Sequence, residues 1–312
     1  MSALQRATSR LVRNVIYYGG LSSVLSRVQR QPRILMLHGI GSAESPAGAF
    51  RAQLSFLKRF FRIVPLEQIW TSSSADRDAR PKLALTFDDG LRNNFSTAYP
   101  ILKEFSAPAT FFVCPGLIDS GSWLWNHECR ARLAWMPEEE RRRFGESLGV
   151  RSVEIEAIIQ RLKSTPNVDR VEIEQRLRTA TPNFVPTEQQ SQQFDIMSWK
   201  ELKAIDDGLI TIGGHSTNHE ILPQLDSYQL EREVADCKTW LERELDRPVK
   251  HFCYPDGAYN AQVLACVGRH FASAVTTQAG WVPPKPSLLE LPRIPTSFHL
   301  PDLAWRMQRP TS

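Results

Sequence analysis

Residues Leu83–Gly90 read LALTFDDG, an apolar run that ends directly in two carboxylates and a glycine. Comparable runs recur at Arg33–Leu37, Thr110–Val113, Leu209–Gly213, His251–Tyr254 and Ala272–Thr276. Short apolar runs with polar boundaries are typical of strands buried on both faces of a parallel sheet. Segments with apolar residues at helical spacing lie between these runs, at Phe50–Phe61, Tyr99–Phe105, Tyr228–Leu245 and Ala261–His270. This alternation predicts an α/β fold with a mostly parallel sheet and its helices outside.

Polar side chains collect where four of these strands end. His38 follows the first run, the Asp88-Asp89 pair follows the second, His215 and His219 follow Leu209–Gly213, and Asp256 follows His251–Tyr254. Each cluster alone is compatible with an ordinary turn or helix cap. In a parallel α/β fold the strand ends face one rim, which is where α/β barrels place their active sites. We therefore expect the four clusters to converge.

The residue types at this rim suggest metal chemistry. His215 and His219, four residues apart, together with one aspartate form a two-histidine, one-carboxylate set that leaves coordination positions open. A second, adjacent aspartate would remain free to accept a proton from water activated by the ion. The alternative interpretation is that the two histidines belong to an ordinary polar surface loop.

Three motifs in order also resemble a known family. TFDDG (Thr86–Gly90), HSTNH (His215–His219) and FCYPDG (Phe252–Gly257) are similar to the first three motifs of the polysaccharide deacetylases, the NodB-homology group or carbohydrate esterase family 4. The opening strand ILMLHGIG, the block Met197–His219 and the segment LPRIP (Leu291–Pro295) extend the resemblance over residues 33–119 and 195–296. The histidine after the opening strand is similar to that of the exopolysaccharide-type subgroup. The resemblance implies a distorted (β/α)7 barrel, one divalent metal ion, usually zinc, and hydrolysis of an N-acetyl or sometimes O-acetyl group on a glycan.

When the family's residue roles are transferred by matching position, the resemblance implies that Asp88 is the general base. It assigns the metal to Asp89, His215 and His219. It assigns the stabilisation of the oxyanion to the backbone around Asp256, in a loop shaped by Tyr254 and Pro255.

Two departures from the family pattern leave roles open. Cys253 occupies the position of an arginine that normally orients the base, and we expect Arg293 to replace it, the alternative being an ion pair elsewhere on the surface. The late Leu-x-His motif, which commonly supplies the general acid, is missing. His38 is the preferred substitute and His299 the alternative.

The chain divides into four parts. Residues 1–33 carry six arginines and no acid, and residues 1–32 have apolar residues at helical spacing, which predicts a basic amphipathic helix. This helix either packs on the domain or contacts an anionic membrane surface. Residues 33–300 form the catalytic domain, interrupted at about 120–195 by a helical insertion, and residues 301–312 are a C-terminal tail. Three tryptophans near the start of the insertion, Trp123, Trp125 and Trp135, are either packing anchors or a sugar-stacking surface.

Composition limits the remaining possibilities. The 312 residues have 42% hydrophobic content and a net charge of +4, which excludes a mainly disordered chain, and no basic stripe with interleaved aromatics indicates nucleic-acid binding. The five cysteines form no C-x-x-C pair and the start lacks the features of a secretory signal, so we expect a cytoplasmic enzyme. It would meet a lipid-linked or nucleotide-linked N-acetylated sugar, and it would be peripheral at the membrane if the basic helix contacts that surface. Two other functions stay open. One is hydrolysis of a small amide or cyclic ureide in a deep closed pocket, and the other is glycan binding on an inactive scaffold.

Overall fold

The computed structural model describes residues 13–14, 29–71, 78–205 and 208–309. The predicted basic helix of residues 1–32 therefore lies almost entirely outside the described residues. Within the described part, no helix combines the length and the apolar character needed to cross a membrane.

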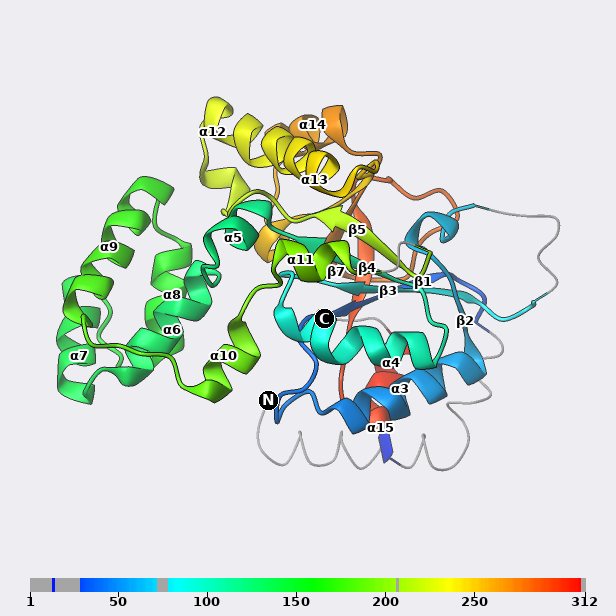
Figure 1. Cartoon of the computed structure of the whole chain (residues 1–312), viewed down its shortest axis with the longest axis horizontal. Coiled ribbons are helices and arrows are strands. Elements are labelled where there is room, and N and C mark those ends of the chain that lie inside the picture. The colour runs from blue at the N-terminus through cyan, green and yellow to red at the C-terminus, as the bar shows by residue number, and fades with distance from the viewer. Residues whose placement is uncertain (1–12, 15–28, 72–77, 206–207, 310–312) are drawn as a thin grey trace.

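A closed parallel barrel forms the centre of the molecule (Figure 1). Its seven strands are β1 (Arg33–Leu37), β3 (Lys82–Phe87), β4 (Ala109–Val113), β5 (Ile210–Gly214), β6 (His251–Cys253), β7 (Ser273–Ala279) and β8 (Leu291–Pro295). Neighbours along the chain pair with one another, and the pairing of β1 with both β3 and β8 closes the ring. The barrel is irregular, since β6 is only three residues long and the register between β7 and β8 shifts. The predicted distorted (β/α)7 barrel is confirmed.

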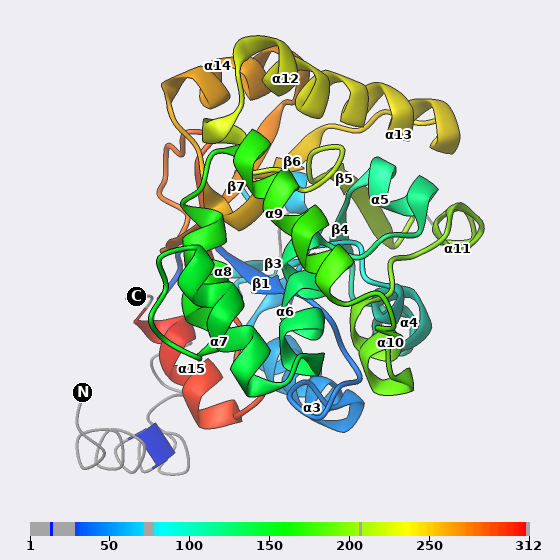
Figure 2. The ribbon, with the colours of Figure 1, turned by 90° about the vertical axis from the view of Figure 1, so that its left-hand side faces the viewer.

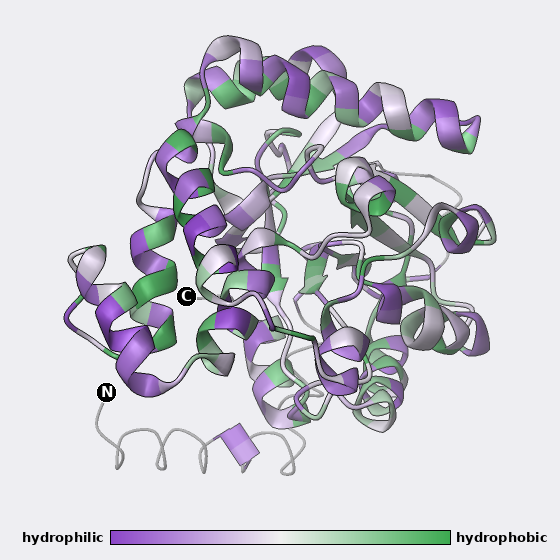
Figure 3. Ribbon diagram, turned by 60° about the vertical axis from the view of Figure 1, so that its left-hand side comes forward, coloured by the Kyte–Doolittle hydropathy of each residue, from purple (hydrophilic) through white to green (hydrophobic). Residues whose placement is uncertain are grey.

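Helices surround the strands, and those outside the insertion bury apolar side chains against them. Their bounds are α3 (Ala47–Phe60), α4 (Tyr99–Glu104), α5 (Pro115–Ser120), α6 (Trp125–Trp135), α7 (Glu138–Ser147), α8 (Ile155–Lys163), α9 (Asn167–Ala180), α10 (Glu188–Phe194), α11 (Trp199–Lys203), α12 (Ser227–Glu231), α13 (Cys237–Leu245), α14 (Ala261–His270) and α15 (Leu300–Gln308). Figure 3 shows their mixed hydropathy, with hydrophilic stretches along the outer helices. In α3, for example, Phe50, Leu54 and Leu57 are all fully buried, as the helical spacing predicts. Asn260 caps α14 by accepting a hydrogen bond from the backbone N–H of Val263 (2.9 Å).

Three elements differ from the expectations. The sequence pattern did not predict β2 (Arg62–Ile63), a two-residue strand that pairs in parallel with β3. It also did not predict β8, because the two prolines in β8 weaken the strand signal. Residues 301–308 were expected to be part of a tail but belong to α15, which buries Leu303 and Met307. The carbonyl of Met307 also accepts a hydrogen bond from the side chain of the buried Arg33 (2.8 Å). This end of the chain is therefore part of the barrel wall.

The insertion, α6–α10, lies at one end of the barrel and has a small hydrophobic core of its own (Figure 2). Ile158, Ile159 and Leu162 of α8 are fully buried in that core. The chain returns to the barrel next to the Asp-Asp-Gly loop, where Leu91 and Ile196 form an antiparallel bridge. The helical insertion predicted at about 120–195 thus begins and ends close to the rim where the polar clusters were expected.

Gly213 of β5 offers a direct test of barrel packing. A Cβ atom at this position would stand 2.5 Å from the Phe112 ring and 2.9 Å from the carbonyl oxygen of His251. We expect Gly213→Ala to lower the free energy of unfolding by about 1–3 kcal/mol, because the added methyl group would overpack the barrel interior. Urea denaturation would measure this loss. Gly48→Ala, in α3 with open space around the new methyl group, is the control and should change stability by at most about 1 kcal/mol; equal effects of the two substitutions would contradict the packing argument.

Candidate active site

Three buried side chains converge at the carboxyl rim of the barrel. The Nε2 atoms of His215 and His219 each lie 3.5 Å from Oδ1 of Asp89. The candidate ligand atoms of these three residues are all within 4.8 Å of one another. Burial alone would raise the pKa of Asp89, but the two imidazoles beside it lower that pKa well below its usual value. The three residues are therefore an ionised carboxylate and two imidazole nitrogens aimed at one point, a donor set that fits a divalent cation such as zinc.

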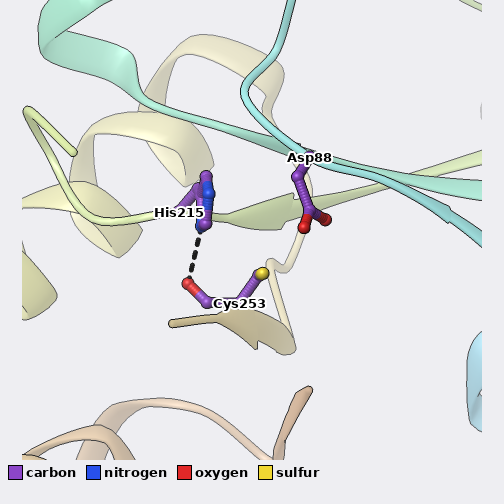
Figure 4. A group of neighbouring side chains, drawn as sticks. All are labelled: Asp88, His215 and Cys253. Atoms are coloured by element: carbon purple, nitrogen blue, oxygen red, sulfur yellow. Dashed lines mark hydrogen bonds between the residues drawn. The ribbon is translucent and has the colours of Figure 1, made fainter. Parts of the chain in front are cut away.

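The backbone around His215 prepares that histidine for coordination. Its Nδ1 lies 2.7 Å from the carbonyl oxygen of Cys253 (Figure 4). A carbonyl can only accept a hydrogen bond, so Nδ1 carries a proton, and Nε2 is the ring nitrogen that faces Asp89 and is available to a metal ion. Such an outer contact to a backbone carbonyl is typical of histidines that bind metals.

Local backbone strain also marks the site. Asp89 has φ 73° and His219 has φ 59°, left-handed values that non-glycine residues rarely adopt. The buried Glu233 supports the loop before His219 by accepting hydrogen bonds from the backbone N–H (2.9 Å) and the side-chain amide (2.7 Å) of Asn218. The fold thus maintains an unfavourable backbone at two of the three candidate ligands, a feature that clusters at functional sites.

Asp88 lies beside this cluster and is bound by a different partner. Arg293 of β8 donates two hydrogen bonds to its carboxylate, each of 2.7 Å. The guanidinium is itself fully buried and also donates to the carbonyl of Thr276 (2.8 Å), which fixes its orientation. Burial would raise the pKa of Asp88, but the charge and hydrogen bonds of Arg293 lower it. Asp88 is therefore held ionised in a fixed direction.

Cys253 replaces the family arginine in sequence but does not carry its function. Its thiol lies near Asp88 and His215 (Figure 4), and a hydrogen bond from Arg293 reaches its sulfur (3.3 Å). Burial raises the pKa of the thiol. A neutral, buried thiol is a poor nucleophile and a poor metal ligand, so this cysteine serves as a small packing residue against Arg293.

The two histidines considered as general acid lie in different surroundings. Nε2 of His38 is 4.0 Å from Oδ2 of Asp88, and its side chain is 52% exposed. His299 instead lies at the start of α15, where its Nδ1 is 3.2 Å from the carboxylate of Asp302. The geometry therefore favours His38, which borders the cavity described below.

The loop Tyr254–Gly257, part of the third motif, directly follows Cys253, whose carbonyl contacts His215. The phenol of Tyr254 donates a hydrogen bond to the carbonyl of Leu289 (2.9 Å), and its ring stacks on Tyr259 with 4.9 Å between ring centres. Pro255–Gly257 forms a short 3-10 turn in which Asp256 has φ 54°. The carboxylate of Asp256 accepts a bond from Lys163 in α8 (2.5 Å). The Tyr254 and Asp256 side chains are thus used for anchoring, and only the backbone of this loop remains for an oxyanion role.

A cavity of about 330 Å³ borders His38 and Asp89, and the insertion contributes part of its lining. The insertion residues are His127, Gln193 and Phe194. The rings of His127 and Phe194 pack with centres 4.6 Å apart, and burial lowers the pKa of His127 to about 4. The sequence predicts no site residue in the insertion, because nothing in the local sequence around His127 indicates that α6 returns to the barrel rim.

Two of the three tryptophans near the start of the insertion, Trp123 and Trp125, serve as packing anchors, whereas Trp135 is 46% exposed and packs edge-on against Phe184. Trp123 donates its indole N–H to Asp195 (2.8 Å) and packs edge-on against Phe194. Trp125 is buried beneath the guanidinium of Arg170, 4.5 Å from the ring centre. Both contacts hold the insertion together near the cavity.

A closed parallel barrel with its polar cluster at the carboxyl ends of the strands belongs to the class of α/β-barrel proteins that carry their active sites at this rim. The sequence model of the polysaccharide deacetylase family matches residues 75–271, and the chain belongs to that family. A stretch of 85 residues is 32% identical to YxkH of Bacillus subtilis (strain 168), which is named as a polysaccharide deacetylase. That stretch covers 26% of this chain and 30% of YxkH.

Solved structures show the same fold. The deacetylase PplD of Streptococcus pyogenes, in complex with acetate, has a TM-score of 0.60 at 21% identity over 90% of this chain and 99% of its own. IcaB from Ammonifex degensii has a TM-score of 0.58 at 16% identity, covering 90% and 96% of the two chains. The deacetylase domain of BpsB from Bordetella bronchiseptica has a TM-score of 0.55 at 15% identity, covering 86% and 96%. At these identities the likeness concerns the fold.

Proposed function

We propose that the chain is a metal-dependent deacetylase that removes the acetyl group from an N-acetylated sugar in a glycan or glycan precursor. The observation that carries the proposal is the ionised Asp88, held by Arg293 directly beside the cluster of Asp89, His215 and His219. Asp89 belongs to the candidate ligand set and Asp88 does not. Hydrolysis by activated water requires both a ligand carboxylate and a separate carboxylate that accepts a proton.

Asp89, His215 and His219 would hold the ion, most simply Zn²⁺. A bound zinc ion supplies Lewis acidity, which polarises an acyl oxygen and lowers the pKa of water. Asp88 accepts the proton of the attacking water, and Arg293 keeps its carboxylate turned toward the site. The buried surroundings exclude bulk solvent from both carboxylates.

His38 is the proposed general acid. Its Nε2 faces Asp88 at 4.0 Å and its side chain is accessible from the cavity, so it can deliver a proton to the departing amine. The backbone N–H of Asp256 is the proposed donor to the oxyanion, because Pro255 has no N–H and the N–H of Tyr254 is bonded to the carbonyl of Val275 (3.4 Å).

The cavity also bears on the two other functions. It opens to the surface and continues into neighbouring depressions, which favours a glycan over a small amide or cyclic ureide in a closed pocket. The complete set of acid, base and ligand candidates argues against an inactive glycan-binding scaffold. Three further parts of the proposal are supported by the sequence. They are membership of the exopolysaccharide-type subgroup, a lipid-linked or nucleotide-linked substrate in the cytoplasm, and contact of residues 1–33 with a membrane surface.

Acetate release tests the function. The purified chain, incubated with N-acetylated oligosaccharides, lipid-linked sugars and nucleotide sugars, should release acetate from at least one of them. Treatment with a chelator should abolish release, and added Zn²⁺ should restore it. Release that persists after the metal has been shown to be removed would contradict metal dependence, and no release from any substrate would contradict deacetylation.

A further inference from the structure

A cavity of about 550 Å³ lies at the amino end of the barrel, opposite the rim that carries the candidate active site. Its lining includes Arg62 and Lys82, the first residues of β2 and β3, and residues 30–32, which directly precede β1. The backbone N–H of Val282 donates to the carbonyl of Pro32 (3.0 Å), which brings the segment between β7 and β8 to the same end. The volume is within the range of small-molecule pockets. We call this cavity the amino-end pocket.

Cations dominate the charged lining of the amino-end pocket. Four basic side chains and one acid line it, an excess of three positive charges; these residues are Arg30, Arg62, Arg80, Lys82 and Asp78. The guanidinium of Arg80 binds the carboxylate of Asp78 (2.6 Å). Hydrogen bonds from Arg80 lower the pKa of Asp78, and the charge of Arg62 acts in the same direction. The acid is therefore ionised and already engaged, and the lining as a whole stays positive.

Backbone carbonyls hold two of the basic side chains in place. The amine of Lys82 donates to the carbonyls of Gln68 (3.0 Å) and Thr71 (2.5 Å). The guanidinium of Arg30 donates to the carbonyl of Ala79. A carbonyl accepts a hydrogen bond but does not carry the full negative charge of a carboxylate. These contacts position the cations, and guanidinium and ammonium groups are the side chains that proteins use to bind phosphate oxygens.

An apolar surface forms the remainder of the lining. Ile69 and Val282 are buried there and belong to one hydrophobic cluster. The ring of Trp70 packs edge-on against His251 with 6.2 Å between ring centres, which fixes its orientation. Proline rings restrict the surrounding backbone at four lining positions, Pro32, Pro81, Pro283 and Pro284. A ligand that joins phosphate to an apolar or aromatic body would match both parts of this lining.

The opposite end of the barrel has the reverse charge. The cavity at the candidate active site is lined by Glu44 and Asp89 and by no lysine or arginine. The side chains of the protein therefore direct an anion to the amino end and away from the rim. Independently, residues 1–33 carry six arginines and no acid, and this basic stretch leads directly into the pocket at Arg30.

We propose that the amino-end pocket binds the phosphate groups of an anionic ligand whose apolar or aromatic part lies against Trp70. An acidic phospholipid and a nucleoside diphosphate share this chemistry. The pocket is separate from the candidate active site, and the inference does not depend on the proposed function. With a lipid as the ligand, the amino end of the barrel would face the membrane and the rim would face away from it.

Binding of phosphate-bearing probes to the full chain tests the inference in two arms. In the first arm, the chain is sedimented with vesicles of phosphatidylcholine that contain phosphatidylglycerol, and with vesicles of phosphatidylcholine alone. In the second arm, ADP is titrated into the chain in a calorimeter. We expect binding in at least one arm. Binding to the acidic vesicles alone identifies a lipid phosphate as the ligand, and binding of ADP alone identifies a soluble one.

Variants locate the binding. Arg30→Gln/Lys82→Gln removes two cations from the pocket and should weaken binding about tenfold or more, since each basic residue at an anionic surface contributes about fivefold. Arg30→Gln alone changes an exposed side chain and should lose about fivefold, so it decides the test if the double variant is unstable. Arg151→Gln/Lys200→Gln removes the same two kinds of charge from exposed positions outside the lining, and this control should bind like the wild type.

Four results would overturn the pocket. They are no binding in either arm, binding that the pocket variants leave unchanged, equal weakening in the pocket variants and the control, and binding that disappears when a chelator removes metal from the rim. The second result would leave the basic stretch before Arg30 as the binding element, and the third would show that net charge alone attracts the probe. None of these measurements uses acetate release, so their outcome and that of the deacetylase assay are independent.

Discussion

Asp88→Asn should lower kcat for acetate release by about 100- to 10,000-fold, the usual contribution of a general base. Asparagine has almost the same shape as aspartate but cannot accept the proton at neutral pH. The three candidate metal ligands are untouched by this substitution, so Zn²⁺ affinity should remain close to that of the wild type. Steady-state kinetics together with metal analysis of the purified variant would measure both quantities.

His215→Ala is the contrasting variant. It removes one nitrogen from the cluster and should lose both Zn²⁺ binding and activity. A loss of metal in Asp88→Asn similar to that in His215→Ala would show that Asp88 belongs to the ligand set. Retention of activity in Asp88→Asn would contradict its role as the base.

Arg293→Met should have the largest effect on stability. The substitution removes the guanidinium and leaves the carboxylate of Asp88 buried without its charged partner. Breaking a buried ion pair from one side typically costs about 3–5 kcal/mol of the free energy of unfolding. Activity should fall as well, because Asp88 loses its orientation. Urea denaturation of the metal-free chain would give the change in stability without a contribution from bound metal.

The double variant Asp88→Asn/Arg293→Met provides the control. It removes both charges together and should recover much of the stability lost in Arg293→Met, while activity stays low. If the two single losses simply add in the double variant, the ion pair is not the cause of the destabilisation.

The pH dependence of this stability difference has a defined sign. In the wild type Arg293 lowers the pKa of Asp88, so the stabilisation is present above the unfolded-state pKa and is lost as pH falls through the folded-state value. In Arg293→Met the burial that remains raises the pKa of Asp88, so protonation relieves the buried charge at a higher pH. The stability gap between wild type and variant should therefore narrow as the pH is lowered from about 7 to about 4. A gap that widens on acidification would contradict this assignment.

Local patterns in the chain were sufficient to predict most of the barrel. The apolar runs at β1, β3, β4 and β5 matched the observed strands within about one residue, because burial on both faces leaves a nearly continuous apolar sequence. Strands without that signal were missed, β2 because it has two residues and β8 because of its prolines. The helix α15 lies almost entirely in the segment expected to be a tail, and its nine residues are too few for a long periodic pattern.

The candidate ligands and Asp88 were also predictable, because strand ends in a parallel barrel meet at one rim and the motifs occur in family order. Arg293 was expected to orient Asp88, with an ion pair elsewhere on the surface as the alternative, and the tertiary structure decided between the two. Arg293 and Asp88 are 205 positions apart in the chain, and their contact exists because β8 and β3 both pair with β1. In the same way, only the folded chain brings Arg30, Arg62 and Lys82 together at the amino end of the barrel. Sequence periodicity reports whether a residue is buried, whereas the neighbour against which it is buried depends on how the whole barrel closes.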